Sequence, residues 1–271
     1  MGDNDLASKA GTVKIGDVNV NRLGLGTNRI TDTPQSYELL KCAVDLGVNF
    51  IDTAHRYGSG ASETGIGNGL APYADGVLIA TKGGFDYPGP EGSEAVLRQE
   101  LDESLRRLKL EHIDLYQLHR VDPKVPIEES VAALKKFQDE GKIRHIGLSE
   151  VSVEQLEAAR QVADIVSVQN EYNVLVRHHE ALVDYCTEHG IVFIPWFPLG
   201  GLNGGAEEVE DRLRAVAEQY DASSQQIALA WLLKRSPIML PIPGTLSIDH
   251  LEANLQAASI ALSDKDFQSL L

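Results

Sequence analysis

Cysteine is scarce in this chain, and so are basic residues and long apolar runs. Only two cysteines, Cys42 and Cys186, occur among 271 residues, and each falls within a segment of helical pattern. Neither a disulfide framework nor a cysteine-based metal site is therefore expected. No apolar run is long enough to span a bilayer, and residues 1–10 are polar and lack the apolar centre of a signal peptide. These absences predict a soluble, cytoplasmic protein without a membrane partner.

Positive charge is in short supply relative to negative charge. The chain has 24 Lys and Arg against 40 Asp and Glu, which gives a formal net charge of −16 at pH 7. Such an excess of negative charge argues against nucleic acid or an anionic membrane as a partner. It also means that local hydrogen-bond donors must hold any anionic cofactor, because the overall field of the protein repels it.

The apolar residues, 43% of the chain, are grouped in short runs that alternate with amphipathic segments. The runs typical of strands are 22–27, 49–53, 77–81, 113–118, 143–148, 165–168, 191–196 and 238–242. The segments that predict helices are 34–46, 63–70, 93–108, 127–139, 152–161, 177–189, 209–220, 224–234 and 248–257. Ser93 is a candidate helix cap, and Ser152 opens a capping-box pattern. The strands are uniformly apolar, which favours parallel strands buried on both faces.

Eight β/α units in about 250 residues predict a TIM barrel, with residues 1–271 as one domain. Ahead of these units, two alternating runs flank the turn Gly16-Asp17, which predicts a β-hairpin that caps the bottom of the barrel. A doubly wound sheet is the competing fold, and it needs a glycine-rich phosphate turn after its first strand. Segment 24–29 lacks the third glycine of that motif and segment 65–69 follows no strand, so the barrel is favoured.

Polar side chains stand where several predicted strands end, and in a TIM barrel functional groups gather there. Asp52 ends the second strand, with Tyr57 on the loop beyond it, while Lys82 follows the third strand and His119 the fourth. Taken singly, each has an ordinary explanation, such as loop packing for the tyrosine or solvation for the lysine. Because they stand at the ends of successive strands, one shared catalytic site is the better interpretation.

Segment 50–58, Phe-Ile-Asp-Thr-Ala-His-Arg-Tyr-Gly, resembles the signature of the aldo-keto reductases. The resemblance extends over nearly the whole chain, and Asp52, Tyr57, Lys82 and His119 fall where the catalytic tetrad of that family falls. It implies reduction of a small aldehyde or ketone to an alcohol. NADPH would supply the hydride, with NADH also possible, and Tyr57 would supply the proton.

The electrostatics of proton donation are consistent with these residue types. A free tyrosine titrates at ~10 and is a sluggish acid at neutral pH. An ammonium group beside it, here that of Lys82, favours the phenolate. A unit charge at about 4 Å contributes only about 1 kcal/mol in bulk water, so the site is expected to be partly shielded from solvent. Asp52 would keep Lys82 charged and oriented, and a neutral His119 would orient the substrate oxygen.

The resemblance also implies contacts to the nicotinamide. Ser149 and Gln169, after the fifth and sixth strands, fall where the family holds the nicotinamide amide, and Glu150 stands where the family has an Asn. A carboxylate accepts hydrogen bonds but cannot donate them, so part of this contact differs from that of the family. Trp196 fits the aromatic residue that stacks on the nicotinamide ring, with core packing as its alternative explanation.

Loop residues account for the other cofactor contacts that the resemblance implies. Pro198, Leu199 and Gly200, within segment 197–201, match the loop over the pyrophosphate. The remaining positions of the implied cofactor site are Gly26, Thr27, Asp52, Thr245, Leu246, Ser247, His250 and Asn254. Many members carry Lys where Gly244 stands and Arg where His250 stands, and both bind the 2′-phosphate. Backbone donors at the start of the last predicted helix, with Thr245 and Ser247, remain for that role.

The substrate pocket is expected to be open. The chain ends at Leu271, soon after the last predicted barrel helix, so the long carboxyl-terminal loop of many relatives is expected to be absent or very short. An open pocket predicts loose specificity, and the protein is expected to act as a monomer. The residues expected to bound this pocket are Asn28, Arg56, Phe85, Arg120 and Trp196.

Two other classes of function deserve comparison. An NADPH-binding regulatory or sensor protein on the same fold, like the β subunits associated with potassium channels, would keep the four residues while turning over poorly. The sequence leaves this alternative open. A metal-dependent barrel hydrolase needs several His and Asp ligands at strand ends, and Asp52 and His119 are too few.

Overall fold

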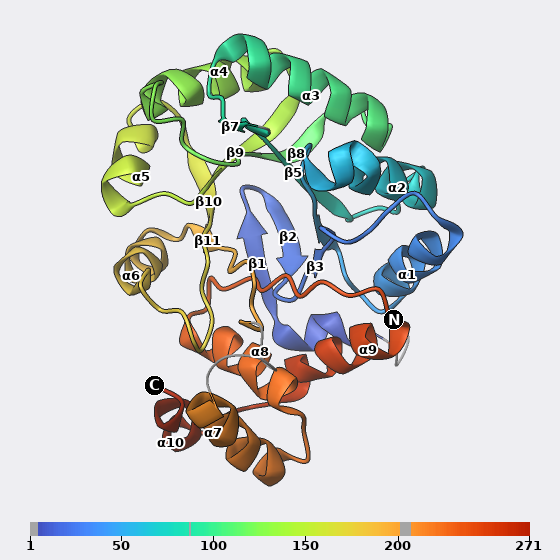
Figure 1. Cartoon of the computed structure of the whole chain (residues 1–271), viewed down its shortest axis with the longest axis vertical. Helices are drawn as coiled ribbons and strands as arrows, with labels where there is room; N and C mark the ends of the chain where they lie inside the picture. Colours follow the sequence, from blue (N-terminus) through green and yellow to red (C-terminus); the bar gives the residue numbers. More distant parts are fainter. Residues whose placement is uncertain (1–4, 87, 201–206) are drawn as a thin grey trace.

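Seven parallel strands curl into a ring that is surrounded by helices (Figure 1). The computed structural model describes residues 5–86, 88–200 and 207–271 of the chain. Neighbouring strands in the sheet follow the order β11-β10-β9-β8-β5-β4-β3. Their bounds are β3 (Leu25–Gly26), β4 (Phe50–Asp52), β5 (Leu78–Gly83), β8 (Ile113–Leu118), β9 (Ile143–Ser149), β10 (Ile165–Gln169) and β11 (Val192–Phe193). The architecture is an α/β barrel, as the alternation of strands and helices predicts.

The eighth strand expected at 238–242 does not form as a regular strand, but its segment closes the ring. On one side, the backbone N–H of Leu240 donates to the carbonyl oxygen of Phe193 at 2.9 Å. On the other side, the carbonyl oxygen of Pro241 accepts from the N–H of Gly24 at 3.0 Å. Because a proline has no N–H, Pro241 cannot donate a ladder bond in return. The segment therefore joins β11 to β3 through isolated hydrogen bonds.

The helices pack around the outside of the sheet (Figure 1). The α-helices are α1 (Pro34–Asp45), α2 (Ala61–Leu70), α3 (Glu94–Leu108), α4 (Ile127–Asp139), α5 (Val153–Arg160), α6 (Glu180–His189), α7 (Glu207–Ala217), α8 (Ser224–Arg235), α9 (Ile248–Gln256) and α10 (Asp264–Ser269). Short 3-10 turns are η1 (Ala7–Ala10), η2 (Tyr57–Gly60), η3 (Glu218–Tyr220) and η4 (Ala257–Ser259). No helix in the described part of the chain is long and apolar enough to cross a membrane.

Most helix boundaries agree with the sequence pattern, with a few exceptions. The capping box at Ser152 is confirmed, since its hydroxyl accepts from the N–H of Gln155 and the Gln155 side chain accepts in return. Ser93 occupies the cap position of α3 but makes no side-chain capping bond. The helix expected from 177 begins only at Glu180. Helix α10 was not expected.

The apolar core has two parts. One fills the space between the sheet and the helices. The other lies among the strands and includes the hairpin formed by β1 (Thr12–Ile15) and β2 (Val18–Asn21). Val13, Ile15 and Val20 of this hairpin belong to the same buried cluster as Phe50 and Leu115 of the barrel strands. Figure 1 shows the hairpin at the centre of the ring.

The segment after β5 carries a small hairpin rather than an irregular loop. Its strands β6 (Phe85–Asp86) and β7 (Gly89–Pro90) pair antiparallel. The sequence pattern did not predict this hairpin, because each strand has only two residues and a short strand leaves no alternation to detect. The hairpin begins directly beyond β5 and thereby places Phe85 near the carboxyl ends of the barrel strands.

Candidate active site

The carboxyl ends of three neighbouring strands bring the predicted catalytic residues together. Asp52 is the last residue of β4, Lys82 lies near the end of β5, and His119 directly follows β8. Tyr57 opens the 3-10 turn η2 beyond β4. Parallel strands end at one edge of a sheet, so polar residues at the strand ends converge although they are far apart in sequence.

Lys82 is completely buried and lies between two of these residues. Its Nζ donates to Asp52 Oδ2 at 2.7 Å, to the carbonyl oxygen of Thr53 at 2.7 Å, and to the hydroxyl of Tyr57 at 3.4 Å. Burial by itself lowers the pKa of Lys82. The charge of Asp52 and the interaction with Tyr57 outweigh burial, so the net shift of that pKa is upward. The lysine is thus held as an ammonium ion beside the tyrosine hydroxyl.

Asp52 is itself anchored by two glutamines. Its second oxygen, Oδ1, accepts from Gln117 Nε2 at 3.2 Å and from Gln169 Nε2 at 2.9 Å. Sequence reasoning missed Gln117 entirely and assigned Gln169 only to the cofactor. The signal was an amide side chain near the end of a buried strand, two positions before His119. Both carboxylate oxygens of Asp52 are therefore satisfied, although only 1% of the residue is exposed.

His119 is held neutral by its surroundings. Burial, followed by the charges of Lys82, Arg120 and Arg56, keeps the pKa of His119 well below its usual value. Its Nδ1 is buried and has no hydrogen-bond partner among the described residues. The ring lies edge-on to Tyr57, with 5.9 Å between the ring centroids. A neutral imidazole next to a tyrosine hydroxyl can offer a hydrogen bond to an oxygen placed between them.

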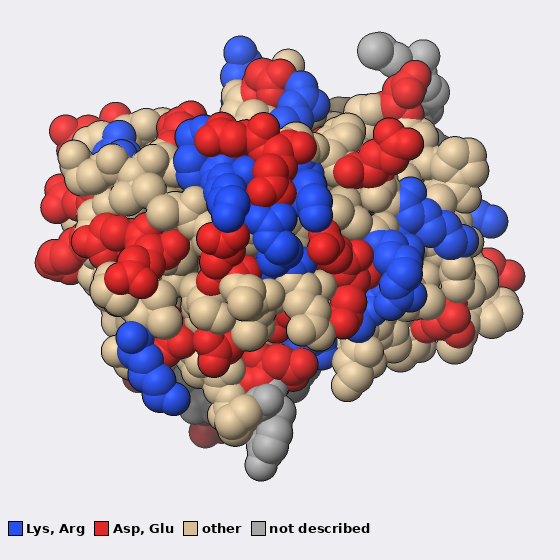
Figure 2. All heavy atoms as spheres, turned by 90° about the horizontal axis from the view of Figure 1, so that it is seen from above, with Lys and Arg blue, Asp and Glu red and all other residues tan. Residues whose placement is uncertain are grey.

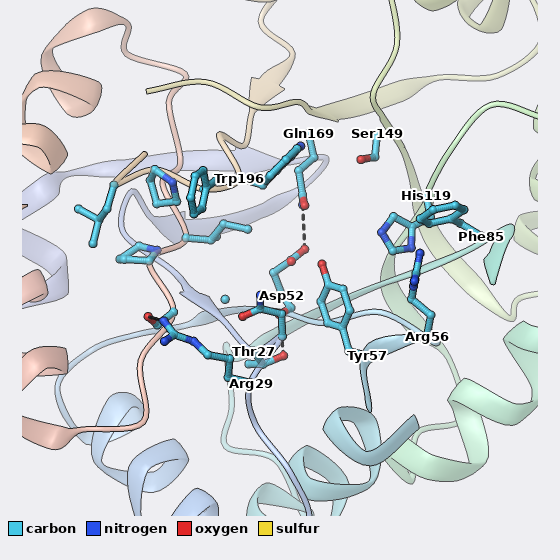
Figure 3. A pocket seen from close by; sticks show the side chains of 18 of the residues that line it. Thr27, Arg29, Asp52, Arg56, Tyr57, Phe85, His119, Ser149, Gln169 and Trp196 are labelled. Atoms are coloured by element: carbon cyan, nitrogen blue, oxygen red, sulfur yellow. Dashed lines mark hydrogen bonds between the residues drawn. The ribbon is translucent and has the colours of Figure 1, made fainter. Parts of the chain in front are cut away.

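A cavity of about 710 Å³ opens at this edge of the barrel (Figure 3). The predicted site residues that line it are Gly26, Thr27, Asn28, Asp52, Arg56, Tyr57, Phe85, His119, Arg120, Ser149, Gln169, Trp196, Pro198 and Leu199. Arg29 and Gln225 also line it, although the sequence did not assign them to the site. Phe197, from the loop expected over the pyrophosphate, and Ile242 and Pro243, from the segment expected at the adenosine end, line it as well. Gly244, noted only as a departure from the family pattern, also lines the cavity.

Several predicted residues lie outside the cavity lining. Lys82 is enclosed behind Tyr57, as its burial requires. The others that do not line the cavity are Glu150, Gly200, Thr245, Leu246, Ser247, His250 and Asn254. Of these, the residues from Thr245 to Asn254 belong to the loop and first turns of α9, immediately after Gly244. Gly201, expected in the loop over the pyrophosphate, lies outside the described residues.

The start of α9 presents a compact set of donors and hydroxyl groups. Ser247 is the cap residue, and its hydroxyl accepts from the N–H of His250 at 3.4 Å. Thr245 Oγ1 accepts from the N–H of Ser247 at 3.0 Å. Beside this helix start, Arg29 Nη2 donates to the carbonyl oxygen of Gly244 at 2.8 Å. A helix start beside a guanidinium group suits a phosphate-bearing ligand.

Glu150 does not line the cavity, but it accepts a hydrogen bond from the indole of Trp196, which does. Its Oε1 accepts from Trp196 Nε1 at 2.6 Å and from the N–H of Glu171 at 2.9 Å. The backbone of Glu150 has a φ of 55°, in the left-handed region, and its N–H donates to the carbonyl oxygen of Gln169. The carboxylate that the sequence assigned to a cofactor contact thus fixes the orientation of Trp196.

The described residues include no group of three or more His, Cys, Asp or Glu side chains that could hold a metal ion. The cavity offers instead an aromatic face at Trp196, a hydroxyl at Ser149, and a cation at Arg29. These groups fit a flat, polar ring linked to phosphates. Figure 3 shows Asp52 and Tyr57 in the middle of the cavity, between Trp196 on one side and His119 on the other.

Together, the curled parallel sheet and the polar cavity at its strand ends define an α/β-barrel enzyme. The family model of the Aldo/keto reductase family matches residues 22–270, so the chain belongs to this family of oxidoreductases. An uncharacterized oxidoreductase of Schizosaccharomyces pombe is 47% identical, with 97% of this chain and 90% of the relative covered. Pyridoxine 4-dehydrogenase of Escherichia coli is 37% identical, with 96% of each chain covered.

A solved structure is similar over the same length. The aldo-keto reductase of Klebsiella pneumoniae, solved in complex with NADPH, aligns with a TM-score of 0.85 at 30% identity. The alignment covers 96% of this chain and 93% of the Klebsiella chain. The fold and the family therefore agree with each other, and both agree with the α/β barrel that the sequence predicts.

Proposed function

We propose that this protein is an NADPH-dependent reductase that converts the carbonyl group of an aldehyde or ketone to an alcohol, with Tyr57 as the proton donor. The observation that carries the proposal is the position of the buried Lys82, whose Nζ lies 2.7 Å from Asp52 and 3.4 Å from the Tyr57 hydroxyl. The NADPH bound to the Klebsiella relative supports the choice of cofactor.

NADPH, when bound, supplies the hydride that adds to the carbonyl carbon. As the carbon–oxygen π bond breaks, its electron pair moves to oxygen, which takes the proton of the Tyr57 hydroxyl. The Lys82 ammonium stabilises the phenolate left behind, and solvent later returns the proton. Because Lys82 is fully buried, this attraction is worth more than in water, about 4 kcal/mol at 4 Å for an effective dielectric constant of about 20.

His119 and Asp52 position the reacting groups in this scheme. His119 stays neutral because burial and three neighbouring cations lower its pKa, so it donates a hydrogen bond to the carbonyl oxygen without adding a charge. Asp52 holds the ammonium of Lys82 and is held in turn by Gln117 and Gln169. Proton donation by a positioned group contributes about 10²- to 10⁴-fold to the rate of such a reaction.

The donor set around the cavity suits the cofactor. We assign the nicotinamide to the region of Ser149, Gln169 and Trp196, with the indole held in place by Glu150. The remaining residues that we assign to the pyrophosphate and adenosine parts are Gly26, Thr27, Pro198, Leu199, Gly200, Thr245, Leu246, Ser247, His250 and Asn254. Arg29, which lines the cavity beside Gly244, adds the cation that Gly244 lacks.

Three further features belong to the proposal: the position of the hairpin, the domain and oligomeric state, and the substrate class. The hairpin β1–β2 closes the end of the barrel opposite the cavity, which is supported by its burial among the barrel strands. The chain acts as a monomer with a single domain, and the single domain is supported by the match of one family model to residues 22–270. The physiological substrate is a small carbonyl compound.

The test is a spectrophotometric screen of NADPH oxidation against aldehydes, ketones and α-dicarbonyls. The reductase should oxidise NADPH with several aldehydes, and Tyr57→Phe should abolish most of that turnover. A sensor protein on the same fold would bind NADPH tightly and show no turnover with any member of the panel. That result would favour the sensor hypothesis over the reductase hypothesis.

A further inference from the structure

Two arginines converge on one side of the cavity, around Phe85. The guanidinium carbon of Arg56 lies 4.2 Å from the centroid of the Phe85 ring, and that of Arg120 lies 5.4 Å from the same centroid. Phe85 in turn lies edge-on to His119, with 5.3 Å between their centroids. Both guanidinium groups therefore contact a ring that itself contacts His119, the histidine that we assign to the carbonyl oxygen.

Neither arginine has an acidic partner among the described residues. Arg56 is exposed and lines the cavity, and its guanidinium group lies over the Phe85 ring. Arg120 donates from Nη1 to the carbonyl oxygen of His119 at 2.8 Å and to Ser149 Oγ at 3.1 Å. Its remaining N–H groups make no hydrogen bond with the part of the chain that the structure describes.

Arginines in the described part of the chain fall into two groups. On the face that carries α3 and α4, Figure 2 shows basic side chains interleaved with acidic ones, and Arg98 pairs with Glu140 there. Others have no ion pair, and Arg22 and Arg29 donate to backbone carbonyl oxygens instead. What distinguishes Arg56 and Arg120 is their position, because both line the cavity and lie over the Phe85 ring beside His119.

The two cations also raise the electrostatic potential where the substrate reacts. Burial lowers the pKa of Arg120, and the nearby charge of Arg56 lowers it further. Both arginines contribute to the lowered pKa of His119. Glu150 is the acid whose charge acts most on Arg120, but its Oε1 already accepts from Trp196 and from a backbone N–H. Two like charges held together without a counter-ion create a site for an anion.

We propose that the substrate of this reductase carries an anionic group, a carboxylate or a phosphate, which Arg56 and Arg120 bind while the carbonyl lies at Tyr57 and His119. The inference rests on the proposed reductase function and deepens it by naming the substrate class. A guanidinium group binds carboxylates and phosphates with paired hydrogen bonds, and such bonds also orient the ligand. A short carbon chain between the two groups matches the nearness of Phe85 to His119.

The proposed cofactor site does not account for Arg56, whereas Arg120 borders it through its bond to Ser149. In Figure 3, Arg56 and Phe85 lie beyond Tyr57, away from Arg29 and Trp196 on the opposite side of the cavity. The phosphates of NADPH are assigned to that opposite side, near Gly244 and the start of α9. A purely structural role, the stacking of a guanidinium group on the half-buried Phe85 ring, implies no preference among substrates.

The experiment compares matched substrates that differ only in the anionic group. Steady-state kinetics would be measured for 4-formylbenzoate against its methyl ester, and for glyceraldehyde 3-phosphate against glyceraldehyde. The anionic member of at least one pair should have a kcat/KM about 10- to 100-fold higher than the neutral member, mostly because its KM is lower. The neutral substrate cannot form the charge-assisted hydrogen bonds to the arginines. A preference within the first pair would identify a carboxylate as the anionic group, and a preference within the second pair would identify a phosphate.

Variants then assign the preference to the two arginines. In Arg56→Gln the KM ratio within the preferred pair should fall about tenfold or more, and Arg120→Gln should act in the same direction. Arg214→Gln is the matched control, because Arg214 is exposed, pairs with Asp211 and is not part of the cavity lining. It should leave the ratio as in the wild type. The dissociation constant of NADPH, measured by fluorescence, should stay within about twofold in Arg56→Gln.

The outcomes separate the two proposals. If no substrate of either pair is reduced while NADPH still binds, the reductase function itself fails. If neutral and anionic substrates are reduced equally well, or if Arg56→Gln and Arg120→Gln both leave the KM ratio unchanged, the anionic substrate class is overturned and the reductase stands. Circular dichroism of each variant would show that a lost preference is not a loss of folding.

Discussion

The indole Nε1 of Trp196 donates to the carboxylate of Glu150 at 2.6 Å, and the two residues are 46 positions apart in the chain. Trp196 forms one wall of the cavity, and Glu150 lies behind that wall. The same carboxylate oxygen also accepts from the backbone N–H of Glu171. In the proposed cofactor site, Glu150 would therefore act through the orientation of the tryptophan rather than by a direct contact.

Replacing Glu150 by Leu should loosen Trp196 and weaken cofactor binding. A hydrogen bond to a charged group contributes about 1.5–3 kcal/mol, so the dissociation constant of NADPH should rise about 10- to 100-fold. Glu150→Gln keeps an acceptor oxygen for the indole and should have a smaller effect. Fluorescence titration with NADPH measures both. Equal affinities for the wild type and Glu150→Leu would mean that the bond does not position the ring.

Tyr57→Phe should separate binding from chemistry. The ring remains, so NADPH affinity should stay within a few-fold, whereas kcat should fall about 10²-fold or more because the proton donor is lost. Single-turnover kinetics with saturating aldehyde measures the chemical step directly. An unchanged rate would remove Tyr57 from the role of proton donor.

Lys82→Met should damage both activity and stability. It leaves the carboxylate of Asp52 buried without its cation, and breaking a buried ion pair in this way costs about 3–5 kcal/mol. Urea unfolding should therefore show a lower midpoint. The double variant Asp52→Asn/Lys82→Met removes both charges and should recover part of the stability but none of the activity. If Lys82→Met alone kept most of its activity, the stabilisation of the phenolate by Lys82 would be wrong.

His119 should make the protein less stable in mild acid. Its pKa is lowered in the folded protein, whereas a histidine in an unfolded chain titrates at ~6.5. Below that pH the unfolded state binds a proton that the folded state does not, so stability falls by up to about 1.4 kcal/mol per pH unit. Above ~6.5 both states are neutral, and the contribution to the pH dependence vanishes.

His119→Gln isolates this contribution from the many carboxylates. The difference in unfolding free energy between wild type and variant should shrink as the pH falls from about 7 to about 5. Urea titrations at several pH values measure it. A difference that is independent of pH would mean that His119 titrates alike in the folded and unfolded states.

The preference for NADPH over NADH should depend on Arg29. Arg29, bonded to Gly244, supplies a permanent cation near the start of α9, and Arg29→Gln should weaken the preference about 5- to 30-fold. Dissociation constants of both cofactors, measured by fluorescence for the wild type and the variant, give the change. An unchanged ratio would remove Arg29 from the proposed phosphate site.

A second permanent cation at position 250 should act in the opposite direction. His250 is exposed on α9, so His250→Arg should strengthen NADPH binding and leave NADH binding unchanged, because only NADPH carries the 2′-phosphate. Dissociation constants of both cofactors measure the two effects. Equal strengthening for NADPH and NADH would mean that residue 250 does not face the 2′-phosphate.

Local patterns in the sequence were enough to predict the order of the elements and the positions of the catalytic candidates. Uniformly apolar runs predict buried parallel strands, and a polar residue at the end of such a run must lie at the edge of the sheet. Asp52, Lys82 and His119 could therefore be grouped without a structure. The eighth strand was the exception, because Pro241 lacks the N–H that a regular ladder needs.

Contacts between distant segments were decided only by the tertiary structure. The bonds of Gln117 and Gln169 to Asp52, of Arg29 to Gly244, and of Trp196 to Glu150 join residues 46 to 215 positions apart. No periodicity encodes such pairs, since they depend on the curl of the sheet and on side-chain direction. The convergence of Arg56 and Arg120 on Phe85 has the same origin. The sequence by itself determined the chemistry at the strand ends, whereas the closure of the barrel decided which charges surround it.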